Sequence, residues 1–173
     1  MSQIDLNDCI ARLTASGQVI ERLARGVSEA QARWKPAPTE WSILEVVCHL
    51  YDEEREDFRQ RTRLTLEDPS QEWPAIDPQG WVTTRRYAER DLGAALDAFV
   101  AERQASLAWL QSLDAPDWDR GRRHPAGFTL HAGDLLLSWL AHDQWHIRQL
   151  ADLHREYLGA VAAPPYDIGY AGP

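Results

Sequence analysis

Apolar residues recur every three or four positions along four long segments of this chain, and no segment shows the strict apolar–polar alternation that is typical of a strand. The four segments are residues 4–24, 42–66, 91–113 and 129–158. Each amphipathic helix must bury its apolar face against another element, and 173 residues suit one domain with one core. The sequence therefore predicts an all-α fold, a four-helix bundle over residues 1–158, with a Pro/Gly-rich, non-helical tail over residues 159–173.

The second helix has the clearest start signal. Ser42 and Glu45 form an S-x-x-E capping box, in which each side chain can satisfy a free backbone N–H of the other residue. Residues 67–90 contain three prolines and are predicted to be irregular. A connection of this length can run back along a bundle, so the second and third helices can lie parallel on either side of a long crossover. Thr129 is expected to cap the fourth helix.

The overall charge and the cysteine count exclude several classes of protein. A formal net charge of −9 argues against a surface that follows nucleic-acid phosphates or anionic lipid. No apolar run approaches the length of a membrane span, and the first residues do not resemble a secretion signal. The chain has only two cysteines, Cys9 and Cys48, so a disulfide framework is not expected and a cytoplasmic location fits. These features leave a small molecule as the expected binding partner.

Two histidines occupy consecutive inward positions on the fourth helix. His142 and His146 belong to a seam with steps of four and three residues: Leu135, Trp139, His142, His146, Gln149 and Leu153. At a spacing of four residues both imidazoles can reach one ion. His49 on the second helix lies at the shoulder of its apolar stripe and can supply a third nitrogen. The pattern predicts a divalent metal on these three residues, although hydrogen-bonded core histidines would show the same spacing.

The other histidines are interpreted differently. His131 lies almost three turns before His142 and is expected to pack near the end of the bundle, whereas His124 and His154 are expected in loops or at the surface. The string HDQWH resembles the H-E-x-x-H motif of zinc peptidases. Asp143 stands where that motif has its general-base glutamate, and no sheet is expected, so we reject this interpretation.

Several charged residues are candidates for a role beside the metal. Glu53, one turn after His49, can orient a ligand, act as a base or face solvent. Arg103 on the third helix can pair with Glu54 in the core, meet a substrate carboxylate, or keep its charge in solvent. Cys48 points about 100° away from His49 around the helix. A basic loop, with Arg120, Arg122 and Arg123, can attract an acidic thiol or remain solvated.

The chain resembles the DinB-like family, whose superfamily includes bacillithiol S-transferases and mycothiol-dependent maleylpyruvate isomerases. The resemblance runs from about Leu6 to Leu158, and its main segments are WSILEVVCHLYDEE and AHDQWHIRQL. Its most specific part is one histidine in the first half and an H-x-x-x-H pair in the last helix. The resemblance implies a four-helix bundle with a long crossover, a homodimer, and a divalent metal, usually zinc or nickel, on His49, His142 and His146.

Three neutral imidazoles leave a divalent ion with at least one open position, as in catalytic sites. The ion can then activate water or a thiolate. We therefore expect either an enzyme or a non-catalytic metal-binding or ligand-binding bundle. Within the enzyme class, the resemblance favours transfer of a low-molecular-weight thiol to an electrophile, with Glu53 and Arg103 as candidate catalytic residues, and hydrolysis is the alternative.

Overall fold

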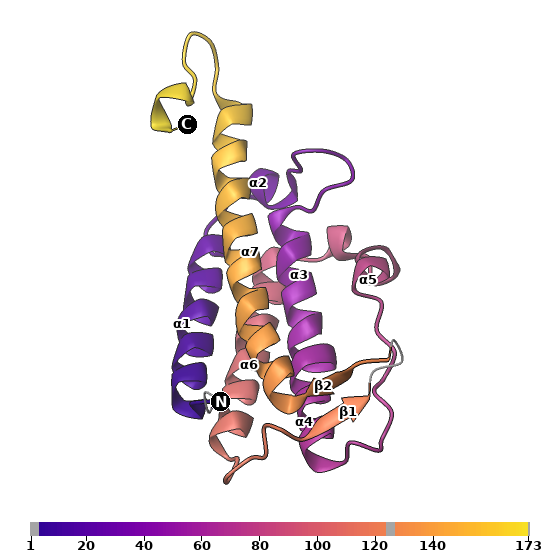
Figure 1. The fold of residues 1–173 in the computed structure, drawn as a ribbon. Helices are drawn as coiled ribbons and strands as arrows, with labels where there is room; N and C mark the ends of the chain where they lie inside the picture. The colour runs from indigo at the N-terminus through magenta and orange to yellow at the C-terminus, as the bar shows by residue number, and fades with distance from the viewer. Residues whose placement is uncertain (1–3, 124–126, 173) are drawn as a thin grey trace.

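The computed structural model describes residues 4–123 and 127–172. Four long helical segments run side by side as a bundle (Figure 1). They are α1 (Leu6–Ala24), α3 (Ile43–Glu53) with its continuation, α6 (Leu92–Gln111) and α7 (Ala132–Val161). In Figure 1, α1 and α7 run upward while α3 and α6 run downward, so the second and third long helices are parallel. The predicted four-helix bundle with a long crossover is confirmed.

The second long helix contains a π-helical turn. After α3, the chain continues through the π-turn Glu54–Phe58 into α4 (Arg59–Glu67). A π-turn inserts one extra residue into a helix and changes the direction of the side chains that follow. At the start of the same helix the predicted capping box is confirmed, because Ser42 Oγ accepts from Glu45 N at 3.3 Å and Glu45 Oε2 accepts from Ser42 N at 2.9 Å.

The crossover is more ordered than the sequence predicts. It contains α5 (Pro78–Thr84) and the 3₁₀ turn Tyr87–Glu89. The Asp77 side chain caps α5, and Pro78 fits its first turn, where no backbone donor is needed. Tyr87 is fully buried and its hydroxyl donates to Asp52 Oδ2 at 2.6 Å. The prediction of an irregular connection was therefore wrong for this stretch, because buried side chains fix it to α3.

The start of α7 also differs from the prediction. Thr129 does not cap the helix but lies in a short antiparallel hairpin of β1 (Gly121–Arg123) and β2 (Thr129–His131). His131 is the N-cap residue, and its backbone N donates to Asp134 Oδ2 at 2.9 Å. His131 is exposed, so the prediction that it packs near the end of the bundle was wrong.

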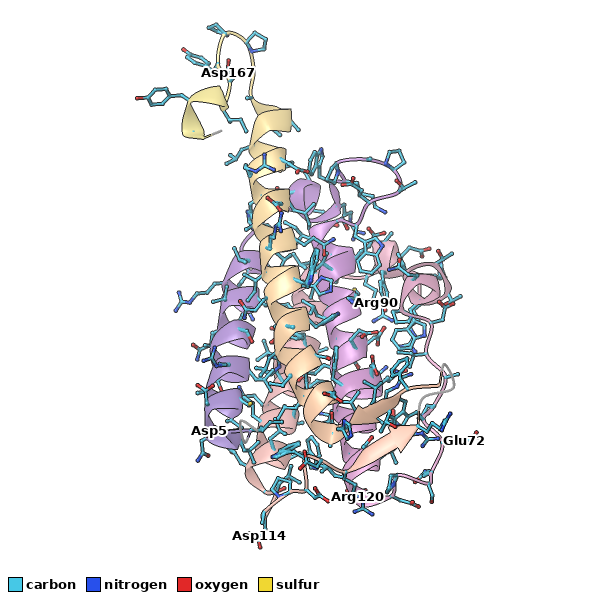
Figure 2. All side chains as sticks on the ribbon, in the orientation of Figure 1. Asp5, Glu72, Arg90, Asp114, Arg120 and Asp167 are labelled. Atoms are coloured by element: carbon cyan, nitrogen blue, oxygen red, sulfur yellow. The ribbon has the colours of Figure 1, made fainter. Side chains whose placement is uncertain are left out.

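The other end of α7 lies beyond the bundle. The helix continues to Val161, so the prediction of a non-helical tail was wrong for its first three residues, and Pro164 follows soon after the end of the helix. The following residues are irregular apart from the 3₁₀ turn Gly169–Ala171, and Asp167 lies well away from the bundle in Figure 2. One short helix, α2 (Glu29–Arg33), precedes α3. Among the described residues, no helix combines the length and apolarity needed to cross a membrane.

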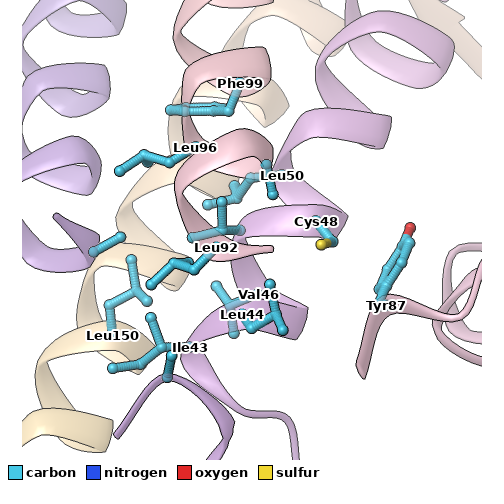
Figure 3. Close-up of a cluster of buried hydrophobic side chains, with 14 of the residues drawn as sticks. Ile43, Leu44, Val46, Cys48, Leu50, Tyr87, Leu92, Leu96, Phe99 and Leu150 are labelled. Carbon is cyan, nitrogen blue, oxygen red and sulfur yellow. The ribbon is translucent and has the colours of Figure 1, made fainter. Parts of the chain in front are cut away.

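The buried apolar side chains form two clusters. The first cluster joins α3, α6 and the crossover with parts of α1, α2 and α7, and Figure 3 shows its centre, with Cys48 on the side of α3 nearest Tyr87. The second cluster joins α1, α6, α7 and the π-turn; its buried members are Cys9, Leu13, Phe58, Leu107, Leu110, Leu136 and Trp139. On α6, Arg103 stands between Phe99 of the first cluster and Leu107 of the second. A buried polar layer therefore lies where the two clusters meet.

Candidate metal centre

Three histidine nitrogens converge between α3 and α7. His49 Nε2 and His142 Nε2 are 3.1 Å apart, and His146 Nε2 lies 3.1 Å from His142 Nε2. One nitrogen from each residue lies within 4.8 Å of the others. Nitrogens bound to one ion at about 2.1 Å are separated by roughly 3.0–3.4 Å in octahedral or tetrahedral geometry. The structure thus brings together all three predicted ligands, and two of the three nitrogen pairs lie at the spacing that a shared divalent ion gives.

The protonation of the three imidazoles also suits a metal. Burial, followed by the neighbouring imidazole of His146, lowers the pKa of His49 to about 3. Burial and both neighbouring imidazoles lower the pKa of His142 to about 2, and burial lowers that of His146. Neutral imidazole is the form that binds metals. Two facing Nε2 lone pairs repel unless a proton or a cation lies between them, so each 3.1 Å contact holds either a hydrogen bond or a shared ion.

Neighbouring side chains set the orientation of the rings. Gln149 Oε1 lies 2.8 Å from His146 Nδ1, and an amide oxygen only accepts, so Nδ1 carries the proton and Nε2 is free to bind an ion. The indole of Trp41 lies 4.8 Å from the His49 ring and is parallel to the His146 ring at 6.5 Å. His49 Nδ1 is buried without a hydrogen-bond partner among the described residues. The sequence placed Gln149 on the seam but gave no signal for the contacts of Trp41.

The three histidines lie at the wall of an open cavity of about 780 Å³. Residues of α7, the loop before α3, α3 itself and the start of α5 line this cavity, and among them are Trp41, Glu53, Trp145 and Gln149. Neither cysteine is among the lining residues. An ion on the three nitrogens would therefore have room for a further ligand.

Glu53, for which the sequence left a role at the site or a solvated position open, lines the same cavity as the three histidines. Its side chain is buried, with 4% of the residue exposed, and its Oε1 has no hydrogen-bond partner among the described residues. Burial raises the pKa of Glu53 to about 8, and the negative charge of Asp57 adds to this rise. Glu53 can therefore hold or release a proton near neutral pH.

Arg103 does not line this cavity. Its Nε and Nη2 donate to the two carboxylate oxygens of Glu54, each at 2.9 Å, and its Nη1 and Nη2 donate to Asp143 at 2.6 and 2.9 Å. Trp139 Nε1 also donates to Glu54 Oε2 at 2.9 Å. Of the roles that the sequence leaves open for Arg103, the structure shows the core pair with Glu54, and a role in catalysis stays a prediction. Asp143 is directed at Arg103, which agrees with the rejection of the zinc-peptidase interpretation.

The remaining predicted candidates lie elsewhere. Arg120, Arg122 and Arg123 lie at or beside β1 and do not line the cavity. His154 is in α7, half-buried, with Nε2 2.6 Å from the carbonyl oxygen of Leu23, so its prediction as a loop or surface residue was wrong. His124 lies outside the described residues.

The fold and the site define a four-helix bundle with a three-histidine cluster at the wall of an open cavity. The chain belongs to the DinB superfamily, since the model of that superfamily matches residues 12–150. The resemblance noted in the sequence is thereby confirmed. Among curated proteins, none matches the chain significantly.

Two solved structures share the fold. YfiT from Bacillus subtilis, described as a probable metal-dependent hydrolase with an unusual four-helix bundle topology, is 19% identical with a TM-score of 0.79. The match covers 91% of this chain and 90% of YfiT. A mutant of the mycothiol-dependent maleylpyruvate isomerase is 10% identical with a TM-score of 0.67, over 92% of this chain and 71% of the isomerase.

Proposed function

We propose that this protein is a metal-dependent enzyme in which a divalent ion, zinc or nickel, on His49, His142 and His146 activates an external nucleophile against a small-molecule substrate. The observation that carries this proposal is the convergence of three neutral imidazole nitrogens at the wall of an open cavity. A divalent ion bound there would lower the pKa of a water or thiol that reaches it.

The nucleophile comes from outside the chain, because neither cysteine is suited to attack. Burial raises the pKa of Cys48 to about 12, and burial also raises the pKa of Cys9. Both thiols therefore stay protonated at neutral pH, and the thiolate is the reactive form. Cys48 also lies in the first apolar cluster, on the side of α3 nearest Tyr87 (Figure 3).

Glu53 is the proton carrier in this proposal. Its carboxyl group lies in the same cavity wall as the histidines and has a pKa of about 8. A general base works best when its pKa is near the working pH. In its ionised form Glu53 accepts the proton that the nucleophile loses, and in its protonated form it returns a proton to the leaving group.

Hydrolysis is the reaction that the cavity favours. Apart from histidine, Arg148 is the only basic residue among the described residues that line it, and Arg148 Nε lies 3.7 Å from Asp152. The basic loop that the sequence offers for an acidic thiol lies elsewhere. Water as the nucleophile needs no basic residues in the cavity to bind it. This reverses the order of preference drawn from the sequence, and the description of YfiT as a probable metal-dependent hydrolase agrees with it.

Thiol transfer is the second candidate. A cavity of about 780 Å³ can hold a thiol and an electrophile together, and one solved neighbour is a mycothiol-dependent enzyme. A neutral or zwitterionic thiol would suit the cavity better than an acidic one, because Glu40, Asp152 and Glu156 also line it.

The test compares zinc-loaded, nickel-loaded and chelator-treated protein on a panel of small esters and amides, with and without added thiols. The proposal expects metal-dependent ester or amide cleavage that does not need a thiol and that disappears in His142→Ala. Metal-dependent conjugation of a thiol would put the transferase first. Absence of both activities over a broad panel, with one metal bound per chain, would favour a non-catalytic binding protein.

A further inference from the structure

The ring of His142 packs against the side chain of Phe58, which ends the π-turn of the second helix. The two ring centroids are 4.9 Å apart with planes tilted by 54°. Phe58 is 8% exposed and belongs to the second apolar cluster. His142 is the central ligand of the three, because its Nε2 is 3.1 Å from the Nε2 of both His49 and His146. A change in its orientation therefore alters both short nitrogen–nitrogen distances.

Phe58 is itself fixed by a stacked tryptophan. Its ring is nearly parallel to that of Trp139, with an angle of 9° and a centroid distance of 5.8 Å. Trp139 is 1% exposed and its indole N–H is used, since it donates to Glu54 Oε2 at 2.9 Å. Glu54 is the first residue of the same π-turn. The two ends of the π-turn thus hold Trp139 from two directions, one by stacking and one by a hydrogen bond.

Two ion pairs also link the π-turn to the residue of α7 that follows His142. Glu54 is paired with Arg103, and Arg103 is paired with Asp143, the residue next to His142. Glu54, Arg103 and Asp143 are each at most 3% exposed, so their bonds are shielded from water. Rotation of α7 about its axis would break the Trp139 bond and the Asp143 pair together. The orientation of His142 therefore depends on the contacts of Trp139, which precedes it on α7, and of Asp143, which follows it.

We propose that Phe58, fixed by Trp139 and Glu54, is a positioning residue that holds His142 in its ligand orientation and thereby raises the affinity for the metal. This inference rests on the proposed metal site but adds that a residue without any ligand atom controls it. Residues that orient metal ligands typically change metal affinity by about 10–100-fold when mutated. Glu54 and Phe58, at the two ends of the π-turn, both lie against the same indole.

The test measures zinc affinity by competition with a coloured chelator for wild type, Phe58→Leu and Trp139→Phe. Phe58→Leu removes the ring against His142, and Trp139→Phe keeps a ring but removes the donor to Glu54. We expect at least tenfold weaker zinc binding in Phe58→Leu and a smaller loss in Trp139→Phe. Cobalt-loaded protein gives a second readout, since a displaced ligand alters the visible absorption bands of the ion.

Leu110→Ala is the matched control, because Leu110 is fully buried in the same apolar cluster. It should lower the melting temperature while leaving zinc affinity and the cobalt spectrum unchanged. The inference is overturned if Phe58→Leu binds zinc as tightly as wild type, or if Leu110→Ala weakens zinc binding equally. Failure of the wild type itself to bind zinc would instead contradict the proposed function.

Discussion

Replacement of Arg103 by Met should be among the most damaging single changes in this bundle. Arg103 is 3% exposed and makes four short bonds to Glu54 and Asp143, which are each 1% exposed. Met keeps most of the aliphatic stem but leaves two buried carboxylates without a cation. Removal of one partner from a buried ion pair costs about 3–5 kcal/mol. For a domain of this size that loss lowers the melting temperature on the order of 10 °C.

The pH dependence of this loss tests its electrostatic origin. Burial raises the pKa of Glu54 even with Arg103 present, and without that cation the pKa rises further. A carboxyl group whose pKa is higher in the folded than in the unfolded state takes up protons on folding, so its destabilising effect decreases as the pH falls. The gap between Arg103→Met and wild type should therefore narrow between pH 7 and pH 5.

Urea and thermal unfolding at several pH values measure this difference. The control is Arg59→Met, which removes an arginine that pairs with Glu102 at a more exposed position, with 22% of its side chain accessible. Such a pair is worth about 0–1 kcal/mol. Similar losses of stability in the two variants at pH 7, or a deficit of Arg103→Met that grows on acidification, would contradict an electrostatic origin.

Three further predictions concern the proton carrier, the helix cap and the assembly. Glu53→Gln should retain metal but lose activity by about 10²–10⁴-fold, because the amide cannot accept the proton that the nucleophile loses. A variant as active as wild type would remove Glu53 from the mechanism. Ser42→Ala should destabilise the fold by about 1 kcal/mol in urea unfolding, because the backbone N–H of Glu45 loses its acceptor; an unchanged transition midpoint would contradict this. A homodimer stays a prediction from the resemblance, and light scattering at micromolar concentration would reject it by giving the 19.7 kDa monomer mass.

Local sequence signals predicted the features that depend on neighbouring residues. The capping box at Ser42 needs only residues three positions apart, and the inward seam with His142 and His146 needs only helical periodicity. His49 followed from its place on the apolar stripe of another helix. These patterns were sufficient for the bundle and for all three candidate ligands.

Other features depend on contacts that no local pattern contains. The π-turn Glu54–Phe58 shifts the helix by one residue, which the spacing of apolar residues between Leu50 and Phe58 does not reveal. Each strand of the hairpin has three residues, too few to establish an alternation. Asp77 and Pro78 form a recognisable helix start, but the prolines around them masked it.

The chemistry of individual side chains was the least predictable part of the site. Glu53 holds a proton near neutral pH because it is buried beside Asp57, and burial appears only in the folded chain. The pairing of Arg103 with Asp143 joins residues 40 positions apart. For Arg103, the sequence therefore left a substrate contact open beside the pair with Glu54.

The measurement that tests the central claim most directly is an anomalous difference map from crystals of zinc-loaded protein, recorded on both sides of the zinc absorption edge. We expect one peak per chain at about 2.1 Å from the Nε2 atoms of His49, His142 and His146, with a further ligand directed into the cavity. No peak at this position, or a stronger peak on other residues, would contradict it.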